Sequence, residues 1–363
     1  MSFIKRAKSV VNIVVNKIRT FYKNKNNVIG IDLGTANTLI CIKDKGIVLN
    51  EASSVSYVIE DGEQIGHLYG NQAKELLGKT PFKIEVANPI EDGVVNRSIL
   101  SENMVRQFMS NVYKQNSLLQ PIVIVGVPFS ASEVEKKALQ EIIEKCNAKE
   151  CLLIYESIAS AVGAGIDIHK PSGSLVIDIG GGTTELSVIS LGGIIKNRSF
   201  KYGGRKIDKS IIDFLAKRYH LLIGENTAEN IKKQIGSVFI TDEENIKSIT
   251  ITGRNLDTNT PQDFTINQKD IVMATAEFTN MLIDNLKELL EITSPELMKD
   301  ISRNGIYVCG GVANLQSIDY IIETITGLKV NIPEQPELCL IRGLNTIVQN
   351  YKQYENILFK QVQ

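Results

Sequence analysis

The chain has 363 residues, and at roughly 150 residues per domain this length predicts two or a few globular units. Hydrophobic residues make up 43% and charged residues 22%, which excludes a disordered chain and a collagen-like fibre. The five cysteines form no CxxC pair, so we expect neither a zinc site nor a disulfide framework, and no run approaches the ~20 apolar residues of a membrane span.

The net charge of −1 is unevenly distributed along the chain. Residues 1–27 contain seven lysines and arginines and no acid, so the remainder of the chain is acidic. A basic end on an otherwise acidic protein predicts an anionic partner for that end. The acidic body argues against nucleic acid as a partner.

The basic end itself has the pattern of an amphipathic helix, because apolar residues recur at steps of three and four. We interpret residues 1–27 as an interfacial helix that lies on an anionic membrane surface. A secretory signal is disfavoured because no cleavage site follows, whereas a helix docked on the body or a frayed tail stays open. The residues expected to enter the membrane include Phe3, Ile4, Val10 and Val14.

Two stretches of the body, 28–42 and 175–189, share one pattern of apolar strand, glycine-containing turn and second strand. Asp32 and Asp178 occupy equivalent places in the two stretches, 146 residues apart. That period is far too long for a solenoid repeat. The pattern therefore predicts two related domains, each of which opens with a β-hairpin.

The tips of these two hairpins have the chemistry of a phosphate site. Glycine lets the backbone approach a ligand closely, and successive N–H groups in a tight turn bind anions. Thr35, Asn37, Thr183 and Thr184 add side-chain donors. An aspartate just before each turn can hold a hydrated Mg²⁺ ion. One such turn is weak support, but two matched copies favour a nucleotide site.

A third glycine turn supports this interpretation. Residues 305–314 predict a buried strand, a turn at Gly310 and Gly311, and then a helix. Backbone at such a turn can pack against a purine or a ribose. The pattern is neither a Walker A sequence nor a Rossmann fingerprint, so we expect the phosphates to lie between the two hairpins.

In this order and spacing the three turns resemble the ATPase fold shared by actin, DnaK-type chaperones and sugar kinases. GIDLGTANTL at 30–39, KGIVLNE at 45–51, DIGGGTTE at 178–185 and IGENTAENIKKQIG at 223–236 resemble the MreB family of bacterial actins in particular. The similarity extends over about 28–351. It implies an α/β fold, the actin-like ATPase fold, with two lobes that each have a duplicated core and an inserted subdomain.

The resemblance also implies the division of the chain. The first lobe has its core in 28–56, 91–172 and 340–355 and its insert in 57–90. The second lobe has its core in 173–205 and 270–339 and its insert in 206–269.

The site residues of the family fall on definite positions of this chain. Those implied to contact the nucleotide are Thr35, Ala36, Asn37, Gly180, Gly181, Gly182, Ala228, Glu229, Asn230, Ile231, Lys232, Gly310, Gly311, Val312 and Ala313. Asp32 and Asp178 match the acids that hold Mg²⁺ through water, and Glu156 and Thr183 match the residues that orient the attacking water.

Glu156 can also be interpreted without the resemblance. It follows an apolar strand and begins a helix of small residues, where a carboxylate can accept a proton from water. A first-turn glutamate favoured by the helix dipole explains the same pattern, and the sequence alone leaves both interpretations open. The resemblance favours the catalytic one. This chain departs from the family pattern at the neighbours of Glu156, at Val312, which replaces a glycine, and at Arg205, which replaces an acid.

A second membrane element is expected at Leu118 and Leu119, an apolar pair in a polar loop. The pair aligns with the apolar loop that MreB proteins insert into lipid. A pair that packs under its own loop is the alternative.

The resemblance thus implies a slow ATPase, with ATP and Mg²⁺ as cofactors, that helps to set cell shape. It implies cytoplasmic head-to-tail filaments, paired in antiparallel fashion, at the inner face of the cell membrane. Other MreB paralogues and cell-shape membrane proteins are further expected partners. The alternatives are a nucleotide-binding scaffold with little or no hydrolysis, a small-molecule kinase, for which we find no acceptor-site signature, and a chaperone ATPase, which needs a substrate domain.

Overall fold

The structure is a computed structural model that describes residues 27–60, 63–113 and 120–360. The expected membrane residues Phe3, Ile4, Val10, Val14, Leu118 and Leu119 lie outside these ranges. Among the residues that the structure describes, no helix is both long and apolar enough to cross a lipid bilayer.

The first lobe is built on a five-stranded sheet with the strand order β10-β9-β1-β2-β3. Its central strand β1 pairs antiparallel with β2 and parallel with β9, and all six of its residues are buried. A strand buried on both faces reads as a continuous apolar run, which explains the sequence of β1. Its elements are β1 (Val28–Leu33), β2 (Asn37–Ile42), β3 (Gly46–Ala52), α3 (Ser98–Val112), β9 (Ile122–Val127), α4 (Glu133–Lys145) and β10 (Glu150–Tyr155).

The second lobe repeats this arrangement with a sheet of the order β18-β17-β11-β12-β13. Here β11 pairs antiparallel with β12 and parallel with β17. The two sheets have the same strand order, which confirms the duplicated core. The elements of this core are β11 (Ser174–Ile179), β12 (Thr184–Ser190), β13 (Gly193–Phe200), α9 (Ala276–Glu291), α10 (Pro295–Asn304), β17 (Ile306–Cys309), α11 (Ile318–Thr326) and β18 (Val330–Asn331).

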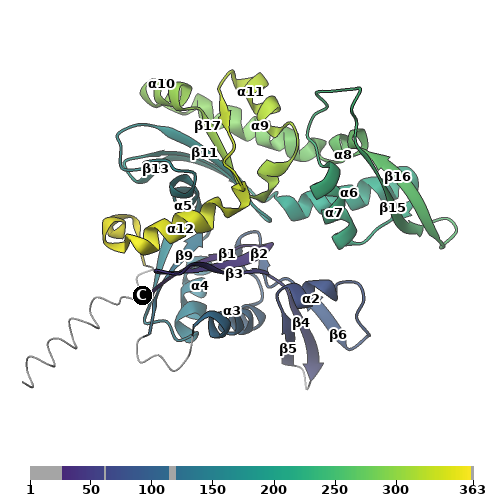
Figure 1. The fold of residues 1–363 in the computed structure, drawn as a ribbon, viewed down its shortest axis with the longest axis horizontal. Helices are drawn as coiled ribbons and strands as arrows, with labels where there is room; N and C mark the ends of the chain where they lie inside the picture. Colours follow the sequence, from purple (N-terminus) through teal and green to yellow (C-terminus); the bar gives the residue numbers. More distant parts are fainter. Residues whose placement is uncertain (1–26, 61–62, 114–119, 361–363) are drawn as a thin grey trace, which may run out of the picture.

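Helices α5 (Glu156–Gly163) and α12 (Cys339–Gln349) lie between the two sheets and join the lobes (Figure 1). Their apolar side chains share one core cluster with strands of both sheets. The helix backbones touch where they cross, because a Cβ at Gly163 would collide with the carbonyl of Cys339. A Cβ at Gly343 would likewise collide with the carbonyl of Ala159. The interlobe contact therefore depends on two glycines.

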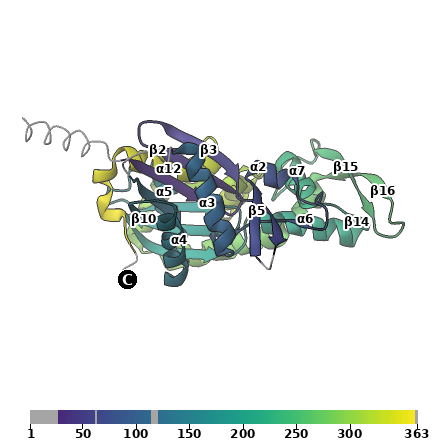
Figure 2. The same ribbon diagram turned by 90° about the horizontal axis from the view of Figure 1, so that it is seen from below.

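Each lobe also carries a smaller sheet. In the first lobe β4 (Val55–Glu60) lies between β5 (Glu63–Tyr69) and β6 (Ile84–Ala87), next to α2 (Asn71–Glu75). In the second lobe the β15–β16 hairpin projects from the body (Figure 2). The elements around this hairpin are α6 (Gly204–Tyr219), β14 (Leu221–Leu222), α7 (Glu225–Ile235), β15 (Ser248–Asn255), β16 (Pro261–Asn267) and α8 (Gln268–Ala274).

Candidate functional site

A cavity of about 670 Å³ lies between the two lobes. Its volume falls in the range of small-molecule and cofactor sites. Asp32 and Asp178 both line it, so the matched acids of the two hairpins share one space. The other expected site residues in its wall are Thr35, Ala36, Asn37, Glu156, Gly180, Gly181, Gly182, Thr183, Glu229, Lys232, Gly310, Gly311 and Val312.

The turn of the first hairpin is held by hydrogen bonds from other parts of its own lobe. The Ser53 hydroxyl donates to the carbonyl of Gly34 at 2.6 Å, and the Ser53 N–H donates to the carbonyl of Ala36 at 3.0 Å. The N–H of Gly93 donates to Thr35 Oγ1 at 2.8 Å. Thr35 is thereby used as an acceptor, which leaves its hydroxyl proton for another acceptor.

The turn of the second hairpin is held by the start of α6. The N–H of Gly204 donates to the carbonyl of Gly180, and the N–H of Arg205 donates to the carbonyl of Gly181, both at 2.9 Å. In the described part of the chain, the N–H groups of Gly181 and Gly182 donate to no protein acceptor. Adjacent free N–H groups in a turn form an anion-binding concavity.

The two turns touch each other across the cavity. A Cβ at Gly181 would lie 2.9 Å from the Cβ of Ala36, and a Cβ at Gly182 would lie 2.6 Å from Thr35 Oγ1. Glycine at 181 and 182 is therefore required by the close approach of the lobes. The two turns therefore border the same part of the cavity.

Buried acids gather beneath the two turns. Asp32 is 9% exposed, and its burial together with the neighbouring charge of Asp178 raises its pKa to about 7. Burial also raises the pKa of Asp178, although the Ser160 hydroxyl donates to its carboxylate and opposes that shift. Carboxylates crowded in this way retain protons unless a cation compensates their charge.

Glu156 is the first residue of α5 and reaches the cavity from the junction with β10. Burial, and then the charges of Glu185, Asp32 and Asp178, raise its pKa well above the ordinary value. Thr183, which is 7% exposed, lines the same cavity. The structure thus brings the two residues expected to orient water into one site.

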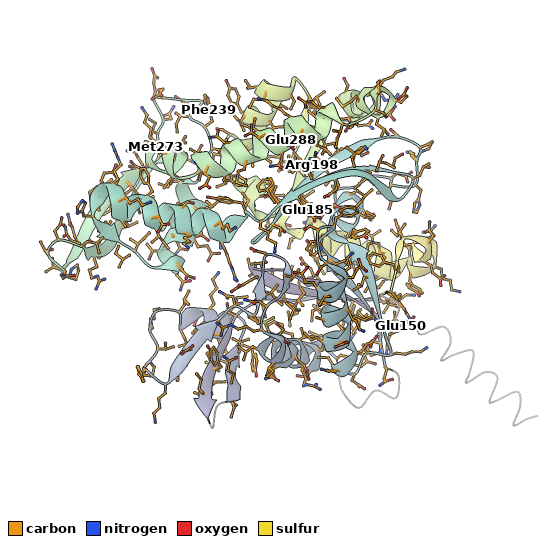
Figure 3. The ribbon with its side chains drawn as sticks, turned by 180° about the vertical axis from the view of Figure 1, so that it is seen from behind. Glu150, Glu185, Arg198, Phe239, Met273 and Glu288 are labelled. Carbon is orange, nitrogen blue, oxygen red and sulfur yellow. The ribbon has the colours of Figure 1, made fainter. Side chains whose placement is uncertain are left out.

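Glu185 was not expected from the sequence, and it joins this acidic cluster from strand β12. It is 1% exposed and lies at the centre of the molecule (Figure 3). The N–H of Phe129 donates to its Oε1 at 2.7 Å, whereas its Oε2 has no partner among the described residues. Burial raises the pKa of Glu185 to about 7. A signal existed in the sequence, because a lone acid in an apolar strand implies a specific role.

Helix α7 presents a different set of side chains to the cavity from the set expected. Ala228 and Ile231 are fully buried in the core of the second lobe, and Asn230 is exposed. Ala313, which follows the third turn, is 2% exposed and packs in the same core. These four residues are not among those that line the cavity, and their contact with a nucleotide stays a prediction. The cavity-facing residues of α7 are Glu225, Asn226, Glu229, Lys232 and Lys233.

Two further cations in the wall were not expected as site residues. Lys74, from the small sheet region of the first lobe, forms an ion pair of 2.6 Å with Glu229 of α7, across the cavity. Arg205, which departs from the family pattern, lines the cavity at the start of α6. Only the folded chain brings these residues to the site, so spacing in the sequence gave no sign of Lys74.

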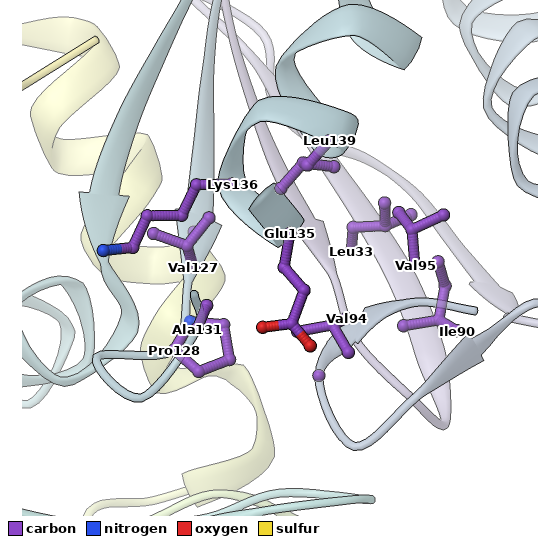
Figure 4. A pocket seen from close by; sticks show the side chains of 12 residues that line it. Leu33, Ile90, Val94, Val95, Val127, Pro128, Ala131, Glu135, Lys136 and Leu139 are labelled. Carbon is purple, nitrogen blue, oxygen red and sulfur yellow. The ribbon is translucent and has the colours of Figure 1, made fainter. Parts of the chain in front are cut away.

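A second cavity lies inside the first lobe, between β1, β9 and α4 (Figure 4). Its volume of about 10 Å³ is room for a single water molecule. Apolar side chains such as Leu33, Ile90 and Leu139 line most of it. It is a packing gap rather than a ligand site.

Two sheets of one strand order, joined by a helix pair and facing each other through two glycine turns, define an actin-like ATPase fold. The chain belongs to the MreB/Mbl family, because the model of that family matches residues 26–356. This confirms the family resemblance of the sequence.

The relatives agree with this assignment. The chain is 39% identical over 335 residues to the cell shape-determining protein MreB of Escherichia coli K12, with 91% of this chain and 94% of the relative covered. It is 37% identical over 322 residues to the cell shape-determining protein Mbl of Bacillus subtilis, with 89% and 96% covered.

Solved structures are similar over nearly their whole length. The crystal structure of Spiroplasma citri MreB 5 bound to AMPPNP has a TM-score of 0.85 and 34% identity, with 92% of this chain and 98% of that chain covered. A structure of the same protein bound to ADP gives the same TM-score. The MamK double helical filament, at 18% identity and a TM-score of 0.74, shares the fold.

Proposed function

We propose that this protein is a bacterial actin that binds ATP between its lobes and assembles into filaments that determine cell shape. The observation that carries the proposal is the contact of two glycine turns across a cavity of about 670 Å³. The names of the relatives from Escherichia coli and Bacillus subtilis support the cell-shape role.

The cavity offers partners for each part of ATP. The N–H groups of Gly181 and Gly182 and the hydroxyl proton of Thr35 suit phosphate oxygens. The backbone at Gly310 and the polar face of α7 suit the adenosine. The AMPPNP and ADP complexes of the Spiroplasma citri relative support a nucleotide ligand.

The donor set also fits Mg²⁺. In the described ranges no group of three or more histidines, cysteines or acids is placed to hold a metal ion. Mg²⁺ keeps several waters and is commonly bound by one or two carboxylates together with substrate phosphates. Asp32 and Asp178 would hold it through water. The ion would neutralise phosphate charge next to carboxylates whose pKa values are raised.

Hydrolysis would depend on Glu156 and Thr183, which orient the attacking water from the wall of the cavity. We expect it to be slow and to weaken the head-to-tail contacts of the filament. A scaffold with little hydrolysis is the second candidate, and one observation favours it. Burial and the neighbouring acids raise the pKa of Glu156, and a raised pKa opposes ionisation of the carboxylate that would accept the proton of water.

We further propose that the filaments are antiparallel pairs at the cytoplasmic face of the membrane. The basic residues of 1–27 and the Leu118–Leu119 pair would be many weak anchors along one filament, and avidity would make the binding firm.

The division into cores 28–56, 91–172, 340–355, 173–205 and 270–339 with inserts 57–90 and 206–269 is part of the proposal. Membrane proteins of the cell-shape machinery and MreB paralogues are its further partners.

Sedimentation tests this proposal. The purified protein is spun with ATP and Mg²⁺, with and without anionic vesicles, beside a variant that lacks residues 1–27. We expect ATP-dependent pelleting of the full chain and weaker vesicle binding by the truncated variant, with binding that falls as salt rises. Equal soluble fractions with and without ATP would contradict filament formation, and equal vesicle binding by both proteins would contradict the membrane role.

A further inference from the structure

Arg205 lies where the second glycine turn meets α6. Its N–H donates to the carbonyl of Gly181, one residue beyond the bond between Gly204 and Gly180. These two bonds fix its backbone against the turn whose free N–H groups face the cavity. Arg205 itself lines the cavity. Its side chain therefore starts from a backbone position that is fixed next to the proposed phosphate site.

The cavity wall holds four basic side chains, and three of them are already paired. Lys74 and Lys233 both bind Glu229, at 2.6 and 2.8 Å. Lys232 binds Asp208 at 2.8 Å and also donates to the carbonyl of Gly204. The lysines are therefore held by protein acids and do not offer a free charge.

Arg205 differs from these lysines. Within the part of the chain that the structure describes, no carboxylate lies within 4.0 Å of its guanidinium, and the side chain makes no hydrogen bond. Glu225, Glu91, Asp208 and Glu229 act on it only from a greater distance, while burial lowers its pKa. A partly desolvated guanidinium without a partner is costly, and a ligand with several oxygens would satisfy it.

The charge of the wall also calls for such a cation. Seven acidic and four basic side chains line the cavity, so groups that can carry negative charge outnumber those that carry positive charge. A triphosphate would increase this excess. Mg²⁺ offsets part of it, and Arg205 is the protein cation that remains available in the described wall.

We propose that Arg205 binds the polyphosphate of the nucleotide through its guanidinium, as a specificity residue that makes affinity depend on the terminal phosphates. This inference rests on the proposed nucleotide site. The planar fork of arginine matches phosphate geometry better than the ammonium of lysine does. Two other roles are outcomes of the test: stacking on the adenine, and an interlobe ion pair with Glu91.

Calorimetric titration of the full chain with ATP, ADP, AMP and adenosine, in the presence of Mg²⁺, separates these roles. The variants are Arg205→Ala, Arg205→Lys and the control Lys206→Ala, which removes the exposed cation next along α6. We expect Arg205→Ala to weaken ATP binding about tenfold or more, because a hydrogen bond to a charged group is lost. Adenosine binding should be unchanged, Arg205→Lys intermediate, and Lys206→Ala like the wild type.

Each other result overturns the inference. Equal losses for ATP and adenosine would indicate stacking or a purely structural role, and no loss for either would leave Arg205 without contact to the nucleotide. Were Arg205→Ala not to fold, Arg205→Lys and Arg205→Gln would be measured instead, with the same expected difference between ATP and adenosine. A wild-type protein that binds no ATP would contradict the proposed function itself, which is a distinct result.

Discussion

The two glycine turns of the cavity come from equivalent hairpins, yet they are held in place by different elements. Ser53, in the short connection between β3 and β4, and Gly93 hold the first turn, and both belong to the first lobe. The start of α6 holds the second turn. A ligand that contacts both turns therefore couples a loop region of one lobe to a long helix of the other.

The acids of the two hairpins differ in the same way. Asp178 accepts a hydrogen bond from the Ser160 hydroxyl, whereas Asp32 accepts none from the described side chains. Burial and the charge of Asp178 then raise the pKa of Asp32 to about 7. The first hairpin thus depends more on a bound cation, and the second more on the protein around it.

The largest expected effect concerns Glu156, which lies between the hairpins. Glu156→Gln keeps the size of the side chain but removes the carboxylate that we propose orients and deprotonates water. We expect phosphate release to fall about 100-fold or more, the usual contribution of a general base, with ATP binding retained. Equal rates for the variant and the wild type would support the scaffold alternative instead.

A matched pair of glycine variants tests the contact of the turns. A Cβ at Gly182 would lie 2.6 Å from Thr35 Oγ1 and 2.7 Å from the Cα of Asp92, whereas a Cβ at Gly180 would meet only the carbonyl of Thr183 at 3.6 Å. Overpacking costs about 1–3 kcal/mol, so Gly182→Ala should weaken ATP binding about tenfold. Gly180→Ala should bind nearly as the wild type does. Similar affinities for the two variants in a binding titration would argue against the contact.

The ion pair across the cavity gives a smaller effect. Lys74 binds Glu229 from the other lobe, whereas Lys233 binds the same carboxylate from its own helix. Burial opposes ionisation of Glu229, but its bonds to Lys233 and Lys74 outweigh burial and lower its pKa to about 2. A partly exposed pair contributes up to about 1 kcal/mol, so Lys74→Ala should release nucleotide about two- to fivefold faster.

Lys233→Ala is the matched control, because it removes a cation from Glu229 without opening an interlobe contact. Stopped-flow release of a fluorescent nucleotide compares the two variants. If Lys233→Ala released nucleotide as fast as Lys74→Ala, the ion pair between Lys74 and Glu229 would have no effect on release beyond that of any cation next to Glu229.

The last effect concerns the stability of the nucleotide-free protein and depends on pH. Burial raises the pKa of Glu185 in the folded protein to about 7, above the ordinary value of 4.5, so the folded state keeps this proton to a higher pH than the unfolded state does. Stability therefore falls as pH rises from about 4.5 to about 7. Glu185→Gln removes this loss and should be more stable than the wild type at pH 8, by up to about 3 kcal/mol, but not at pH 4.

Melting temperatures of the nucleotide-free protein across this pH range measure the difference. Glu141→Gln, at an exposed position of α4, serves as the control and should show no such trend. A constant difference between Glu185→Gln and the wild type at all pH values would contradict the raised pKa of Glu185.

The sequence predicted the parts of the site that are local. A hairpin and its turn are made by neighbouring residues, so two matched patterns sufficed to place Asp32 and Asp178 opposite each other. The 3.6-residue period of α7 would also have separated its faces, since Ala228, Ile231 and Ile235 are spaced by three and four and are all buried. The resemblance assigned 228–232 as one run and so did not separate the buried face of α7 from the face that lines the cavity.

The remaining parts depend on tertiary structure. Lys74 and Glu229 are 155 positions apart and meet only because the two lobes close over the cavity. Arg205 was visible as a departure from the family pattern, but only the positions of its neighbours show that it has no side-chain partner among the described residues. Glu185 is buried because strand β12 is covered on both of its faces.

Every role proposed for the cavity requires that the two glycine turns together bind one triphosphate with its metal. A crystal structure of the protein with AMPPNP and Mg²⁺ tests it most directly. We expect phosphates between Thr35–Asn37 and Gly180–Gly182, with a cation next to Asp32 and Asp178. Nucleotide bound elsewhere on the protein, with the two turns unoccupied, would contradict it.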